Sequence, residues 1–177
     1  MDTNAPFTLV ASSYRTRSGV LEDFTAVWSR RLDGEFRHTA IALLTHGADG
    51  TAHVGRSKST AKHIAWGGAL LGGALFVVAP SAGAELLTAT GLTGAGVIVE
   101  HIHLNTDAPR LAETAELLEQ GTFGLVVVAL NWESQAVTPL LPNADRTIAL
   151  DMSWGDLEEE LSEDPAWRDP AVVLVPR

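Results

Sequence analysis

The chain contains no cysteine, and its basic residues are far outnumbered by its acidic ones. Without cysteine there is no disulfide, no cysteine-ligated zinc and no thiol nucleophile. Among 177 residues, 12 lysines and arginines stand against 22 aspartates and glutamates, a formal net charge of −10. Nucleic-acid binding needs a basic surface to meet the phosphates, so this balance argues against a nucleic-acid partner.

The first residues also lack the features of a secretion signal. No basic stretch precedes the first apolar run, which starts at Phe7 and is broken by Ser12, Ser13 and Arg15. We therefore expect a cytoplasmic protein that is not secreted, either free or associated with the cytoplasmic face of a membrane.

Charge is nearly absent from one long segment. Between Lys62 and Glu100 the only formally charged side chain is Glu85. Residues 1–62 carry a local charge of +2 and residues 63–177 one of −12. The mean hydropathy of +0.12, high for a soluble domain, comes mainly from the uncharged segment.

Turn signals and apolar periodicity divide the remaining chain into short elements. We expect strands at residues 7–11, 38–45, 51–55, 123–130 and 146–150, helices at 18–33, 106–121, 134–141 and 156–161, and an edge strand at 171–175. The strand at 123–130 is the most apolar, which favours a central place in the sheet. The apolar segment is expected as two helices joined at Pro80.

This order predicts an α+β fold, a ferredoxin-like βαββαβ sandwich whose antiparallel sheet is covered by helices on one face. The domain spans residues 6–161 and is interrupted at 62–101 by the Gly-rich apolar helical hairpin. Residues 162–177 form a short C-terminal extension.

Glycines recur through the predicted hairpin. A helical glycine costs roughly 0.5–1 kcal/mol relative to alanine, so their number indicates a need for close helix packing. The candidates for such a contact are Gly67, Gly68, Gly72, Gly73, Gly91 and Gly94.

Two environments suit this hairpin, because one small domain is not expected to cover both of its arms. In the first, hairpins from several copies bury one another in a homo-oligomer. In the second, the hairpin enters membrane lipid, although each arm of about 24 Å is shorter than a hydrocarbon core of about 30 Å. We favour the oligomer and keep the membrane as the alternative.

The order of these pieces resembles a known family. Its features are the turn at Ala48-Asp49-Gly50-Thr51, the run from Trp66 to Gly73 and the strands that follow. On these, residues 6–161 resemble the bacterial domain-of-unknown-function family 1269, whose members are often described as predicted membrane proteins. The resemblance implies the inserted hairpin and no catalytic residues. The tail from Ser162 and the histidines depart from the family pattern.

Histidines are the remaining candidates for chemistry. If Asp49-Gly50 is a two-residue turn, His46 falls opposite His53, and two facing imidazoles are weak candidates for a metal site or a pH-sensitive pair. His101 and His103 form a second pair in sequence. The simpler interpretation is that these are solvated polar residues.

Other catalytic patterns are absent from the sequence. No serine lies in a Gly-x-Ser-x-Gly elbow, and no glycine run has the form of a phosphate-binding loop. The acidic cluster at residues 156–164 is typical of a solvated helix face, with a basic partner or divalent cations as the alternative. Trp132, Trp154 and Trp167 are expected as core or interface anchors.

The sequence therefore predicts a non-enzymatic, self-associating protein without a cofactor. Its expected partner is a second copy of itself, and membrane lipid is the alternative.

Overall fold

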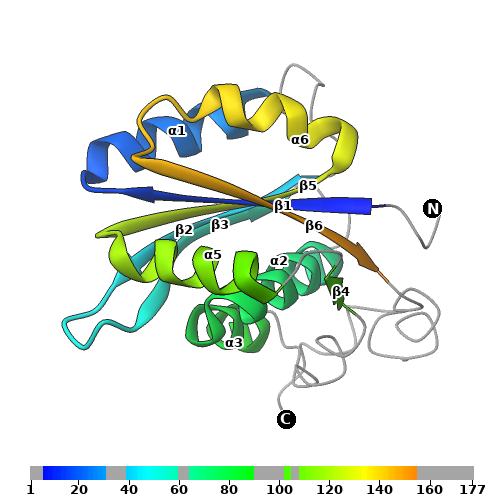
Figure 1. Cartoon of the computed structure of the whole chain (residues 1–177), viewed down its shortest axis with the longest axis horizontal. Helices are drawn as coiled ribbons and strands as arrows, with labels where there is room; N and C mark the ends of the chain where they lie inside the picture. Colours follow the sequence, from blue (N-terminus) through cyan, green and yellow to red (C-terminus); the bar gives the residue numbers. More distant parts are fainter. Residues whose placement is uncertain (1–5, 31–38, 60–63, 90–101, 105–107, 155–177) are drawn as a thin grey trace, which may run out of the picture.

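The computed structural model describes residues 6–30, 39–59, 64–89, 102–104 and 108–154. Its elements, in chain order, are β1 (Pro6–Tyr14), α1 (Arg17–Arg30), β2 (Thr39–His46), β3 (Ala52–Ser59), α2 (Ile64–Val78), α3 (Pro80–Ala89), β4 (Ile102–Leu104), α5 (Ala108–Gln120), β5 (Phe123–Leu130), α6 (Asn131–Val137), a short 3₁₀ turn (Thr138–Leu140) and β6 (Arg146–Trp154). Together they form a mixed α+β fold in which one sheet lies between two layers of helices (Figure 1).

The sheet is antiparallel throughout and has the order β3-β2-β5-β1-β6-β4. The expected central place of residues 123–130 is confirmed, because β5 lies between β2 and β1. β3 lies at one edge of the sheet, where its polar residues, such as Ser57 and Lys58, remain in contact with water.

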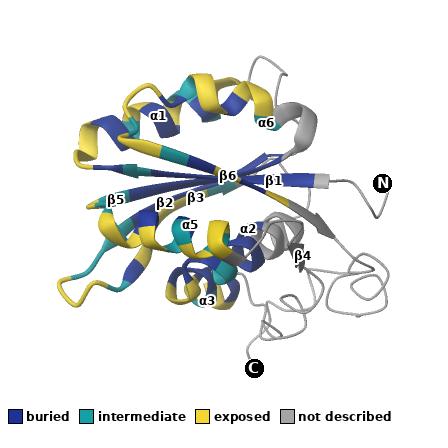
Figure 2. Cartoon of the chain, viewed as in Figure 1, coloured by how far each residue is buried: buried dark blue, intermediate teal, exposed yellow. Residues whose placement is uncertain are grey.

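Helices cover both faces of the sheet, so the predicted one-sided arrangement is wrong. On one face, α1 and α6 bury Val10, Leu125 and Val127. On the other, α2, α3 and α5 bury Val126 and Val128. A strand buried on both faces is apolar at every position, which explains the unbroken apolar run of β5 (Figure 2).

The apolar segment packs against its own sheet. α2 and α3 meet at Pro80 as expected, and Leu71, Leu75, Ala82 and Leu87 are buried in the same core as β5. The expectation that one domain leaves this hairpin uncovered is therefore wrong for its described part. No helix in the described residues is both long enough and apolar enough to cross a membrane.

Other predicted elements are found with changed ends. The helices predicted at 18–33 and 106–121 correspond to α1 and α5. The strand predicted at 146–150 is longer than expected, because β6 runs on through Ser153, which pairs with Pro6. The second hairpin arm beyond Ala89, the acidic helix at 156–161 and the edge strand at 171–175 lie outside the described residues.

The turn between β2 and β3 is longer than the predicted two residues. His46 pairs with Ala52, and residues 47–51 form the loop, in which the Gly47 N–H donates to the Thr51 carbonyl at 2.9 Å. Gly50 has φ of 78°, a left-handed conformation that suits glycine. His53 pairs with Thr45, so the predicted pairing of His46 with His53 is wrong.

Candidate functional site

Two glycines of the hairpin, Gly72 and Gly83, lie close to other parts of the same chain. A Cβ on Gly72 would lie 2.7 Å from Leu87 Cδ2, and one on Gly83 would lie 2.3 Å from the backbone nitrogen of Phe76. Close approach is thus needed between α2 and α3. Gly73 is buried, Gly67 and Gly68 lie in α2, and Gly91 and Gly94 lie outside the described residues.

The two candidate histidines are separate. His53 Nδ1 lies 3.4 Å from Glu85 Oε2, whereas neither ring nitrogen of His46 has a hydrogen-bond partner among the described residues. No group of three potential metal-ligating side chains occurs in the described part of the chain. His103 lies in β4, and His101 lies outside the described residues.

Glu85 joins the hairpin to the sheet edge. Its carboxylate accepts the Val54 N–H at 3.1 Å, and Ser81 Oγ donates to the Ala52 carbonyl at 3.0 Å. These contacts occupy outward-facing backbone groups of the edge strand β3. The one charge of the apolar segment therefore has a structural role in the described fold.

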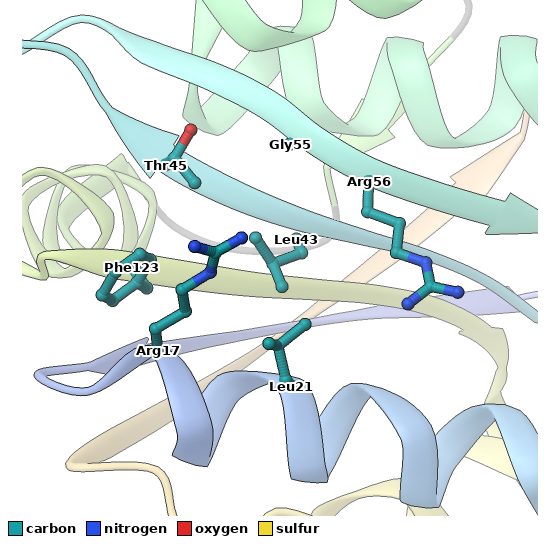
Figure 3. A pocket seen from close by; sticks show the side chains of 7 residues that line it. All are labelled: Arg17, Leu21, Leu43, Thr45, Gly55, Arg56 and Phe123. Carbon is teal, nitrogen blue, oxygen red and sulfur yellow. The ribbon is translucent and has the colours of Figure 1, made fainter.

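A pocket of about 480 Å³ lies on the opposite face of the sheet, between α1 and β3. Its lining residues are Arg17, Leu21, Leu43, Thr45, Gly55, Arg56 and Phe123. Arg17 comes from the first turn of α1 and Arg56 from β3, and Leu43 lies between them on β2 (Figure 3). The pocket combines two guanidinium groups with an apolar floor, in the size range of small-ligand sites.

A β-bulge brings Arg56 to this face. Leu44 pairs with Val54, but Leu43 pairs with Arg56, so Gly55 is the additional residue of the bulge. Ala52 packs in the core next to α2 and α3, and unbroken alternation would direct Arg56 to that same side. The bulge instead places Arg56 opposite Leu43, whose side chain faces α1.

Aromatic rings of α1 support the cations of β3. The Arg56 guanidinium carbon lies 5.0 Å from the centroid of the Phe24 ring, and Lys58 Nζ lies 4.8 Å from that of Trp28. Such contacts stabilise a cation without neutralising its charge. Arg56 and Lys58 therefore keep their positive charge beside α1.

These cations lack acidic partners within the described residues. Arg15 pairs with Asp145 and Arg146 with Glu113, but no described carboxylate forms an ion pair with Arg17, Arg56 or Lys58. Arg17 also stands at the N-terminus of α1, the positive end of the helix dipole. A local positive field thus exists in a protein of net negative charge.

No sequence motif predicts this site, although one residue of the sequence hints at it. Gly55 inside a polar strand is typical of a bulge. The residues that face Arg56 come from α1, β2 and β5, and no short motif connects them.

A buried polar cluster lies beyond the pocket. Tyr14 Oη donates to Asp23 Oδ2 at 3.0 Å, and Asn143 donates to Asp23 Oδ1 through Nδ2 at 2.7 Å and to Oδ2 through its backbone N–H at 3.2 Å. Asp23 is only 1% exposed. Burial, followed by the charge of Asp23, raises the pKa of Tyr14 well above its ordinary value. The cluster fastens the loop before β6 to α1.

The expected tryptophan anchors are only partly placed. Trp132 lies in α6 and Trp154 ends β6, while Trp167 lies outside the described residues.

Comparison with known proteins adds no further assignment: no family model, no curated protein and no solved structure matches this chain.

Proposed function

We propose that the chain is a non-enzymatic binding protein that holds a small organic anion in the pocket between α1 and β3. The observation that carries the proposal is the pair Arg17 and Arg56, which face one pocket with an apolar floor and have no described carboxylate partner. Guanidinium groups bind carboxylate and phosphate through paired hydrogen bonds. Leu21, Leu43 and Phe123 would contact an apolar part of the same ligand.

Phenyl phosphate is a suitable probe, because it joins a dianion to a flat apolar ring. Its titration, followed by the amide resonances of Gly55 and Arg56, should show saturable shifts. Benzyl alcohol, which has the ring without the charge, should bind far more weakly. Affinity should fall with salt, because the site is open to solvent.

Variants distinguish binding of phenyl phosphate in the pocket from a general attraction of this anion to cationic side chains. Arg56→Gln should weaken phenyl phosphate binding about tenfold, since a charge-assisted hydrogen bond is lost. The double variant Arg17→Gln/Arg56→Gln should abolish it. Arg15→Gln is the matched control, because Arg15 is paired with Asp145 and does not line the pocket. Equal affinity in the double variant and the wild type would contradict the proposal.

A second proposal retains self-association through the hairpin, with membrane lipid as the alternative. It is supported by α2, fifteen residues without a charge, and by the uncharged composition of residues 90–99. The test is the mass of the unmodified protein in detergent-free buffer. The variant Gly72→Leu is unsuitable, because its side chain would clash with Leu87 of the same chain and disturb the fold. A monomer of 18.8 kDa at all concentrations contradicts it. Recovery in carbonate-resistant membranes instead would favour the lipid alternative.

We also propose that β1, α1, β2, β5, α6 and β6 form a ferredoxin-like sandwich. The protein is proposed to reside in the cytoplasm. The support for the sandwich is the strand order β6-β1-β5-β2, with α1 and α6 on the same face. The insertion then runs from β3 to α5 and is longer than the predicted segment 62–101. Membership of family 1269 stays a proposal that rests on the glycine run and the order of elements.

A further inference from the structure

The chain carries an acidic segment that matches the pocket in charge. Residues 156–164 hold six carboxylates and no basic residue, and Leu157 and Leu161 stand among them. The segment follows β6 and lies outside the described residues. Its composition combines anionic and apolar side chains, the same two chemistries that the pocket offers.

A basic surface formed by Arg17, Arg56 and Lys58 surrounds the pocket. Arg17 and Arg56 face the pocket, and Lys58 continues the positive charge along β3. Among the described arginines outside this surface, Arg15 and Arg146 have acidic partners, Arg110 donates to the Ala149 carbonyl, and Arg30 has an interaction as well. The surface is thus the part of the described chain where positive charge is left for an acidic partner.

The chain's own acidic segment begins far from this surface. β6 ends at Trp154, beside the Pro6 end of β1, whereas the pocket lies near the Tyr14 end and three strands away (Figure 1). About seven residue steps along a strand and three strand spacings separate them by about 27 Å. From Trp154 to Glu160 an extended chain spans at most about 21 Å. A backbone that extends to Glu160 therefore ends short of the pocket of the same molecule, and only Glu163 and Asp164 lie farther along the segment, which leaves most of its carboxylates for a second copy.

We propose that residues 156–164 of a second copy occupy the basic surface formed by Arg17, Arg56 and Lys58. The inference rests on the proposed function, because it names a second copy of the chain as a source of the anionic groups bound there. The contact joins two different surfaces, so it is head-to-tail and permits either rings or open chains. Carboxylates of one copy pair with the guanidinium groups of the next, and the leucines meet the apolar floor.

Salt provides the first test. Light scattering of the unmodified protein should give a mass above 18.8 kDa at about 0.01 M salt and the monomer mass at about 1 M salt, where the Debye length is about 3 Å. Phenyl phosphate should also dissociate the assembly, because it competes for the same arginines. A monomer at low salt and high concentration overturns the inference, and so does an assembly that neither salt nor phenyl phosphate affects.

A mixing experiment provides the second test. Arg17→Gln/Arg56→Gln removes the basic surface, and Glu159→Lys/Glu160→Lys removes the acidic partner. Each variant alone should be monomeric at low salt, whereas an equimolar mixture should form a dimer, because one retains the segment and the other the surface. Glu116→Lys/Glu119→Lys changes the same charge on α5 and should leave assembly unchanged. No dimer in the mixture overturns the inference.

The two proposals fail in different ways. If phenyl phosphate binds to the Glu159→Lys/Glu160→Lys protein but the mixture stays monomeric, only the inference of a second copy is wrong. If phenyl phosphate does not bind to that protein at low salt and high probe concentration, the pocket itself is not an anion site.

Discussion

The hydroxyl of Tyr14 provides a hydrogen bond to a buried carboxylate, that of Asp23. Tyr14 and Asp23 are each 1% exposed, and the hydroxyl donates to the carboxylate at 3.0 Å. A buried carboxylate without donors is strongly destabilising, so Tyr14 and Asn143 are needed wherever Asp23 is present. No sequence pattern indicates this cluster, because Asn143 lies 120 residues from Asp23 along the chain.

Tyr14 should resist ionisation while the protein is folded. Burial and the nearby Asp23 raise its pKa, so the unfolded state ionises first. The stability that depends on neutral Tyr14 is complete below about pH 10 and is lost as the pH rises towards the raised pKa. Since Tyr14 is the only tyrosine, absorbance of tyrosinate reports on it alone. That absorbance should appear together with unfolding and not before.

The control for this prediction is Tyr14→Phe, which keeps the ring. The variant should lose about 1–3 kcal/mol of stability at neutral pH, because a buried hydrogen bond to a charged group is removed. The part of the alkaline destabilisation due to Tyr14 should disappear. Ordinary titration of Tyr14 in the folded protein would contradict its burial against Asp23.

At the scale of elements, α2 and α3 illustrate a conflict between helix propensity and packing. Gly83 lies within α3, where alanine would favour the helix by about 1 kcal/mol. A Cβ at this position, however, would lie 2.3 Å from the Phe76 nitrogen and 2.4 Å from its Cα. Backbone atoms cannot move aside as a flexible side chain does, so the two helices would have to separate.

We predict that Gly83→Ala destabilises the protein by about 1–3 kcal/mol in chemical denaturation, the usual cost of overpacking. Thr88→Ala is the control, because this exposed position in the same helix should show the ordinary small gain from alanine. A gain in stability from Gly83→Ala would mean that α2 and α3 do not pack this closely.

The contact of Glu85 with β3 belongs to the same scale. Glu85 accepts the Val54 N–H and lies near His53, with 46% of its side chain exposed. Glu85→Ala should speed hydrogen exchange of the Val54 amide by up to about tenfold, since the edge N–H loses its acceptor. Glu85→Gln keeps an acceptor oxygen and should have a smaller effect. Equal exchange rates in all three proteins would contradict the contact.

For the whole molecule, one sheet serves two cores. β5 and β1 contribute side chains to both cores and pair with a strand on each side. The helices above and below therefore depend on the same strands, and the domain should unfold as a unit.

Hydrogen exchange can check this organisation. Amides of β5 and β1 should exchange most slowly, those of β2 and β6 next, and those of the edge strand β3 fastest, because protection follows burial and pairing. Amides of β3 should exchange faster than those of the other strands both before and after the bulge at Gly55. Slow exchange confined to one helix layer, with β5 unprotected, would contradict a shared sheet.

Much of the local structure followed from sequence patterns. The amphipathic stripe of Val20, Phe24 and Val27 predicted α1, and the apolar run of β5 predicted a central strand. The turn at Asp49-Gly50 was located, but its length was wrong by three residues, which moved His53 away from His46. A pairing register depends on loop length, and composition alone does not determine that length.

The sequence by itself determined the α+β content, the joint at Pro80 and the division into an apolar segment and an acidic remainder, because these depend on local propensity and composition. Only the tertiary structure decided that α2 and α3 pack on their own sheet, that Gly72 and Gly83 lie at close contacts within the chain, and that Arg17 and Arg56 share a pocket. These features depend on strand order and on one bulge, which bring together residues distant in sequence. Contacts of that kind arise from the packing of the whole sheet, and no short stretch of the chain encodes them.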